Sequence, residues 1–150
     1  MKNFRKLALT LLLASVASPA SAAHQAGKDP VAPPEPAYDT ATVITIAATV
    51  TETRLVPENQ PMAGLHLMLR SGSETFDVYV GPSDFVKMFD VAFSKGDETE
   101  VIGSKVKSNG ATVVLAREVR RGSITLLLRD KRGMPFWNYS VNPPQDPTMC

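Results

Sequence analysis

The chain has 150 residues, and its 16 Lys and Arg residues nearly balance its 15 Asp and Glu residues, for a formal net charge of +1. This length fits one domain with a real hydrophobic core, and the near-neutral charge argues against a general binder of polyanions. The single cysteine, Cys150, excludes an internal disulfide, and the sequence assigns it no role.

The first 22 residues have the pattern of a secretory signal peptide. Three cations precede an uncharged apolar run, Leu7–Val16, and small residues follow it. The apolar run is too short for a membrane span. We therefore expect residues 1–22 to direct export to a bacterial periplasm, with cleavage after Ala22 or Ala23. Cleavage would change the formal net charge to −2.

Proline-rich segments flank the expected domain. Residues 23–40 and 142–150 hold many prolines and little to bury, and we expect a disordered tether and a disordered tail there. The predicted folded domain is therefore 41–141. It opens with Thr42–Leu55, whose Val, Ile and Thr content is typical of a long strand. Pro57–Ala63 then has the composition of a loop.

The next two segments predict a β-hairpin. Gly64–Arg70 and Phe76–Val80 alternate apolar and polar residues, which is the period of a half-buried strand. A two-residue turn at Gly72-Ser73, of type II′, keeps the apolar residues on one face. The predicted pairs are Leu69–Phe76, Leu67–Val78 and Leu65–Val80 on the buried face, and Arg70–Thr75, Met68–Asp77 and His66–Tyr79 on the other.

A change of period predicts a helix within Gly81–Gly96. Pro82 or Ser83 is expected to start it and Gly96 to end it. The apolar residues then fall at i, i+3, i+4, i+7 and i+8, which is one helical face. These residues are Phe85, Met88, Phe89, Ala92 and Phe93.

Three further strands complete the predicted order. They are Glu98–Lys107, Ala111–Arg120 and Ser123–Arg129, with a hairpin turn at Ser108–Gly110 between the first two. The order β-β-β-α-β-β plus one closing strand predicts an all-β fold with one helix, an OB-fold-like small barrel. The alternative is another small open barrel or a sandwich with a helix at one end.

The residues after the closing strand are expected to fasten it. Asp130–Gly133 has the composition of a tight turn, and Pro135 should end regular pairing. Phe136 and Trp137 are large enough to plug one end of a small barrel. An aromatic ligand platform is the alternative for these two rings.

Several short motifs together resemble a known group. These are GLHLML, YVGPSDF with Gly81 and Pro82, KGDETEVIGSK, LAREV and LLLRDKRGMPFW. In combination they are similar to small exported bacterial OB-fold proteins of uncharacterised function, over Gly64–Trp137. The resemblance implies a fold and a compartment. It carries over no activity and no catalytic residue.

The outer face of the predicted hairpin is the expected binding surface. OB folds commonly bind ligands on this face and on adjacent loops, here Pro57–Ala63 and Ser108–Gly110. The folded domain holds a single histidine and no recognised catalytic motif. We therefore expect a non-enzymatic adaptor without a cofactor, bound to another periplasmic protein. The face comprises His66, Met68, Arg70, Asp77 and Tyr79.

A soft-metal carrier is the alternative function. Met62, His66 and Met68 could together bind Cu(I) or Ag(I), because thioether and imidazole ligands suit these ions. Copper would then be the cofactor. The competing interpretation is that His66 stacks on Tyr79 as an ordinary cross-strand pair. Cleavage after Ala23 would also leave His24 at the N-terminus, where its amine and imidazole could chelate copper.

Oligonucleotide or oligosaccharide binding is the third hypothesis. Tyr79 could stack a base, and basic residues gather in the C-terminal part of the domain. The slightly negative mature charge and the expected compartment argue against nucleic acid, and fold alone is weak evidence for function. The basic set is Lys105, Lys107, Arg117, Arg120, Arg121, Arg129, Lys131 and Arg132.

Arg117 breaks the strand pattern. Alternation along Ala111–Arg120 points its side chain into the core, where a buried Arg needs a carboxylate. Either Arg117 pairs with Asp97, Glu100 or Asp130, or a bulge turns it outward. A sharper hypothesis is that it reaches the carboxylate of a ligand.

Overall fold

The computed structural model describes residues 35–139, so the expected signal peptide, the tether up to residue 34 and the tail lie outside the described residues. Within them lie six strands and one short α-helix. No helix in this part of the chain is long and apolar enough to cross a membrane. The elements are η1 (Thr40–Thr42), β1 (Val43–Val56), β2 (Gly64–Ser71), β3 (Glu74–Gly81), α1 (Ser83–Lys87), β4 (Glu98–Ser108), β5 (Ala111–Arg121), β6 (Ile124–Leu127) and η2 (Phe136–Asn138).

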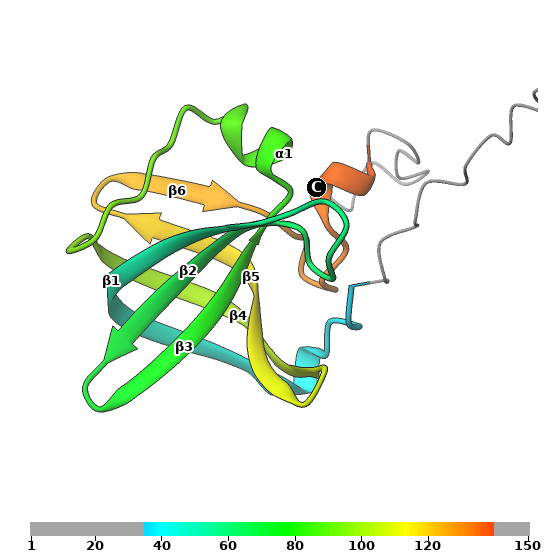
Figure 1. Ribbon diagram of the computed structural model, residues 1–150, viewed down its shortest axis with the longest axis horizontal. Coiled ribbons are helices and arrows are strands. Elements are labelled where there is room, and N and C mark those ends of the chain that lie inside the picture. Colours follow the sequence, from blue (N-terminus) through cyan, green and yellow to red (C-terminus); the bar gives the residue numbers. More distant parts are fainter. Residues whose placement is uncertain (1–34, 140–150) are drawn as a thin grey trace, which may run out of the picture.

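Five strands close into a barrel, and the sixth lies beside it (Figure 1). The strand order is β3-β2-β1-β4-β5-β6, and β3 also pairs with β5 in parallel through Val78–Val114 and Tyr79–Leu115. β1 pairs with β4 along its first part and with β2 along its second part. The β1–β2 pairing has a register shift between Val50 and Glu52. This arrangement confirms the predicted small OB-like barrel.

The core fills the barrel and extends onto its outer side. Because successive strand residues point to opposite faces, Leu67, Leu69, Val78 and Val80 all point inward and are fully buried. A second, smaller cluster lies outside the barrel wall, where Tyr79, Val113 and Leu115 are covered by Tyr38, Met62 and Trp137. Buried residues therefore occupy both faces of β3 and β5.

The β2–β3 register was predicted correctly except at one end. The pairs from Arg70–Thr75 to His66–Tyr79 are all present, and Gly72 has φ 59° as the predicted turn requires. The predicted pair Leu65–Val80 is wrong, because a bulge after Leu65 pairs this residue with Gly81 instead. The bulge accompanies the close approach of the Gly64 and Gly81 backbones, where no side chain fits.

The predicted helix Gly81–Gly96 is wrong in its length. α1 ends at Lys87, and Pro82 is its N-cap, as expected at that end. Met88 is 76% exposed and Phe89 is 42% exposed, so the five-residue apolar face does not form. Asp90 follows with φ 51°, outside the helical region.

The segment after α1 reaches the core without a helix. Val91 and Phe93 pack against the core cluster from an irregular segment. Gly96, predicted to end the helix, instead donates its N–H to the Val50 carbonyl oxygen at 2.8 Å. Apolar spacing thus produced the helix prediction, while backbone hydrogen bonds to β1 determine the path of this segment.

The turn after β6 forms as predicted. Gly133 has φ 91°, and the Asp130 carboxylate accepts N–H bonds from Arg132 and Met134, each at 2.8 Å. Trp137 packs against both clusters, next to Gly81 at one end of the barrel. Trp137 thus lies where the plug was expected, whereas Phe136 belongs to neither cluster and contacts Tyr139.

Candidate functional site

His66, on the predicted binding face, is a buried residue with two partners. Its side chain points out of the barrel but is only 3% exposed. The Nδ1 atom lies 2.7 Å from Asp77 Oδ1, and the Nε2 atom lies 2.9 Å from the Met62 carbonyl oxygen. Both ring nitrogens therefore lie within hydrogen-bond distance of an oxygen atom of the protein.

Asp77 links His66 to Arg54. The Arg54 Nη2 atom donates to Asp77 Oδ2 at 2.8 Å. Burial alone would raise the pKa of Asp77, but the hydrogen bond and charge of His66, with those of Arg54, outweigh it and lower this pKa below its ordinary value. The three side chains therefore form one hydrogen-bonded network across β1, β2 and β3.

This hydrogen-bonded network engages two of the proposed metal ligands, His66 and Met68. Both nitrogens of His66 have protein partners, and the Met68 sulfur lies 3.8 Å from the guanidinium of Arg54. A metal ion bound to Met62, His66 and Met68 would have to displace these contacts and sit beside a cation. Within residues 35–139, no group of three or more His, Cys, Asp or Glu residues could hold a metal ion.

Tyr79 is part of the wall and not an open platform. It is 3% exposed, and its hydroxyl donates to the Ala63 carbonyl oxygen at 3.2 Å. Its ring centroid lies 5.2 Å from that of His66, its cross-strand partner, with the two planes tilted by 43° and not stacked, and 6.2 Å from that of Trp137. A base could not stack on Tyr79 without displacing the side chains that cover it.

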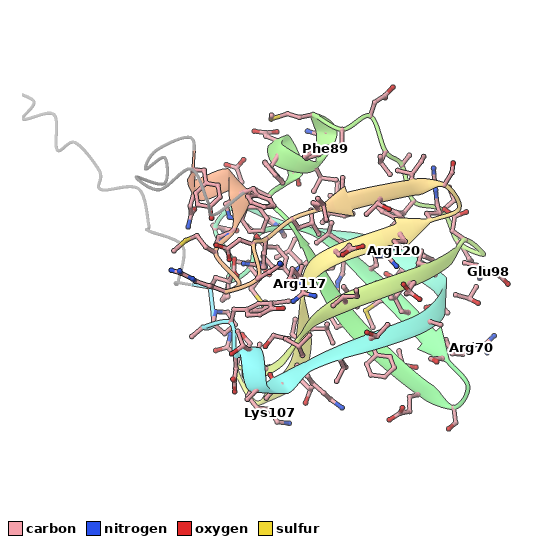
Figure 2. All side chains as sticks on the ribbon, turned by 180° about the vertical axis from the view of Figure 1, so that it is seen from behind. Arg70, Phe89, Glu98, Lys107, Arg117 and Arg120 are labelled. Carbon is pink, nitrogen blue, oxygen red and sulfur yellow. The ribbon has the colours of Figure 1, made fainter. Side chains whose placement is uncertain are left out.

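The expected binding face is therefore closed over most of its area. His66 and Tyr79 are buried, Met68 and Asp77 are half-buried, and only Arg70 is exposed. Arg70 lies instead on an open groove of about 700 Å³ across β1 and β4. Figure 2 labels Arg70 on this side, together with Glu98 and Arg120.

Arg117 leaves the core through a bulge. Gly103 pairs with Ala116 and Ile102 pairs with Glu118, so Arg117 is the extra residue between them and is half-buried. This confirms the bulge alternative. The three acids considered as its partners are engaged elsewhere, Asp97 with Arg121, Glu100 with Arg120 and Asp130 with Tyr139.

The basic set does not form a continuous track for a polyanion. Arg120 pairs with Glu100 and Glu118, and Arg121 pairs with Asp97. Lys105 lies over the ring of Phe76, with its Nζ atom 5.7 Å from the centroid. Several cations are thus matched by local partners, and acidic side chains interrupt the basic surface.

Arg129 is the buried cation that the sequence pattern missed. Its side chain is 1% exposed, and its Nη2 atom lies 2.7 Å from Glu35 Oε1. Its guanidinium carbon lies 4.7 Å from the ring centroid of Trp137 and 6.0 Å from those of Tyr38 and Tyr79. Three aromatic rings, one carboxylate and the carbonyl oxygens of Ala116 and Gly133 therefore surround this charge.

Glu35 and Tyr38 belong to a segment expected to be disordered. We call residues 35–38 the N-terminal strap. Tyr38 packs against Gly133, and the next residue, Asp39, donates its N–H to Ser104 Oγ at 3.0 Å. The folded part thus begins before the predicted boundary at Ala41. An acidic and an aromatic residue in a proline-rich segment were the signal available in the sequence.

The fold and the site define a small OB-like barrel whose outer β2–β3 face is closed by its own side chains. The chain belongs to the MamS/MamX magnetosome protein family, because the model of that family matches residues 42–126, more than half of the chain. A comparison with curated proteins found no match.

The family match refines the resemblance seen in the sequence. It confirms the coarser expectation, a small bacterial protein family, and it does not bear on export or on membership of the exported OB-fold group. It includes β1, which the resembling motifs left out. It begins after the strap and ends before Arg129 and Trp137, so of the aromatic and acidic side chains around Arg129 it includes only that of Tyr79.

Proposed function

We propose that the protein is an exported, non-enzymatic adaptor that docks on another protein in a magnetosome-associated assembly. The family name supplies the setting. Export rests on the signal-peptide pattern of residues 1–22. The non-enzymatic role is supported by the site chemistry, since His66 is fixed between a carbonyl and a carboxylate.

The observation that carries the docking role is the placement of exposed apolar side chains. Met88 and Phe89 follow α1, and Ile124 and Leu127 lie on β6, with exposed fractions from 41% to 76%. Both views draw α1 and β6 on the same side of the barrel, away from the β4–β5 hairpin that bears Lys107 (Figures 1 and 2). We name these four residues the α1–β6 surface.

β6 adds an open strand edge to this surface. It pairs with β5 alone among the described strands. Unpaired edges with apolar side chains commonly bind other chains. Ile124 and Leu127 lie three residues apart, so they flank this edge from opposite faces of β6. The proposed occupant is a protein of the same compartment. We propose that it docks on the α1–β6 surface and not on the closed β2–β3 face.

The copper alternative has weaker support in this geometry. Two of its three ligands would have to leave present partners: His66 its contacts with Asp77 and the Met62 carbonyl oxygen, and Met68 its contact with Arg54. We therefore propose no resident cofactor.

A capture experiment with charge variants tests the docking proposal. Tagged wild-type protein and the double variant Met88→Lys/Leu127→Lys are purified from the native host. Both positions are exposed, so both proteins should fold alike. We expect the wild type to retain a partner in stoichiometric amount and the variant to lose it at least about tenfold, because a lysine in an apolar contact must be desolvated.

The matched control is Ala111→Lys. Ala111 is exposed at the start of β5, in the hairpin at the opposite end of the barrel. We expect it to retain the partner. Equal capture by all three proteins, or capture by none, would contradict docking through the α1–β6 surface.

A further inference from the structure

We propose that Arg129 and the rings around it form a binding site for a carboxylate-bearing peptide, and that the N-terminal strap is its ligand in cis. The ligand class is an extended segment with a glutamate and, three residues later, an aromatic residue. The proposal adds a second surface to the proposed function and stands independently of the α1–β6 surface.

The first argument is the charge of Arg129. A buried guanidinium needs a carboxylate, because removing it from water without a counter-charge is costly. The neighbouring Asp130 does not serve, because it turns its oxygens to N–H groups of its own turn and to Tyr139. The counter-charge comes from Glu35, outside the barrel.

The second argument is the division of parts between strap and barrel. The barrel and its C-terminal turn supply the cation and two rings, Tyr79 and Trp137. The strap supplies the carboxylate and the third ring, Tyr38, which covers the guanidinium at 6.0 Å. A planar guanidinium stacked between rings and facing a carboxylate is a common way of recognising acidic peptides.

The third argument is how the strap is held. Within the described residues, side chains hold residues 35–38, and the first backbone N–H donated to the barrel is that of Asp39. Pro36 has no N–H to donate. A cavity of about 310 Å³ runs alongside the strap, bordered by Arg132 and Met134. The strap can therefore leave without breaking strand pairing.

The pKa directions agree with a lightly held strap. Burial raises the pKa of Glu35 more than the charge and hydrogen bond of Arg129 lower it, and burial likewise lowers the pKa of Arg129. The attraction between the two groups thus does not fully offset their loss of water. Release of the strap returns the Glu35 carboxylate to solvent and leaves Arg129, still bonded to the carbonyl oxygens of Ala116 and Gly133, without its counter-charge, which favours binding of a carboxylate in trans.

Peptide binding to the full mature chain tests the site. Trp137 is the single tryptophan and lies against Arg129, so its emission reports occupancy. The probes are the acetylated, amidated peptides EPAYD, which copies the strap, and QPAYD. The variant Glu35→Gln weakens the strap, Glu35→Asp is a milder substitute if that variant does not fold, and Glu52→Gln is the control at an exposed site on β1.

We expect Glu35→Gln to bind EPAYD with a saturable change in emission, about tenfold or more tighter than QPAYD. Wild type and Glu52→Gln should bind EPAYD about tenfold more weakly, because their own strap competes. Equal binding of the two peptides, equal binding by all proteins, or no binding to a folded Glu35→Gln variant would overturn the proposal. Those outcomes would leave the Met88 and Leu127 experiment unaffected.

Discussion

At the scale of single residues, the hydrogen-bonded set of Asp77, His66 and Arg54 on the outer face of the barrel contributes to the stability of the fold. Asp77 accepts from both His66 and Arg54, and its half-buried carboxylate uses one oxygen for each. Loss of one member of such a set leaves its partners unsatisfied, which costs more than the net value of the hydrogen bonds themselves.

Asp77→Asn should therefore destabilise the protein. The amide has one acceptor oxygen where the carboxylate has two, so either His66 or Arg54 loses its acceptor. We expect a loss of about 1–3 kcal/mol in the free energy of unfolding, measured by urea denaturation. The control Glu52→Gln, at an exposed site, should stay within about 0.5 kcal/mol of wild type. Equal stability of the two variants would show that the His66–Asp77 contact does not contribute.

Low pH should reduce the free energy of unfolding by protonating carboxyl groups that are hydrogen-bonded in the folded protein. Contacts lower the pKa values of Asp77, Asp97 and Asp130 below their ordinary value of 3.8. For Asp97 the first cause is the N–H of Ser94; for Asp77 and Asp130, burial opposes the change and hydrogen bonds outweigh it. A carboxyl group whose pKa is lowered in the folded state adds stability at pH values above its ordinary pKa. That stability disappears as the pH falls through the folded-state pKa.

Urea midpoints measured at pH 5, 4 and 3 check this sign. We expect the midpoint to fall steeply below pH 4, and less steeply in Asp77→Asn. Glu35, whose pKa is raised by burial, acts in the opposite direction and reduces the slope. A midpoint that rises from pH 5 to pH 3 would contradict the assignment of these three carboxyl groups.

At the scale of elements, close contacts between segments explain the geometry of the barrel end. A Cβ atom on Gly81 would lie 2.9 Å from the ring of Trp137. The same glycine pairs with Leu65 after the β2 bulge. The end of β3, the bulge in β2 and the C-terminal plug therefore depend on one another.

Gly81→Ala should cost more than a comparable change in open space. The matched control is Gly96→Ala, since Gly96 also has positive φ, 96° against 154° for Gly81, but nothing near its Cβ position. We expect Gly81→Ala to be less stable than the control by about 1–3 kcal/mol, as for overpacking in a core. Thermal denaturation of both variants measures the difference, and an equal loss in the two would remove the argument from Trp137.

At the scale of the whole molecule, local patterns predicted much of the barrel and little of its outer cover. Alternation gave the register of Leu67 and Leu69 correctly, because one face of a strand must be buried. It failed at Leu65, where contact between two glycines forces a bulge. The helix predicted from apolar spacing was longer than α1, because Phe93 reaches the core from an irregular segment.

The closed face could not be predicted for a different reason. Glu35 and Arg129 lie far apart in the sequence, and each alone has the composition of a solvated position. Their pairing depends on the strap crossing the outer side of β3 and β5. His66 was placed on the correct face, but its buried position includes contacts with the Met62 carbonyl oxygen and Asp77, and the sequence pattern could not position the Met62 loop.

Native mass spectrometry of the protein from a periplasmic extract of its host tests the central claim most directly. One spectrum reads the N-terminus, any bound metal and any bound partner. We predict a chain that begins at Ala23 or His24, carries no metal and is associated with a second protein. A bare chain, a chain that keeps residues 1–22, or a chain that carries copper would contradict the account of an exported adaptor.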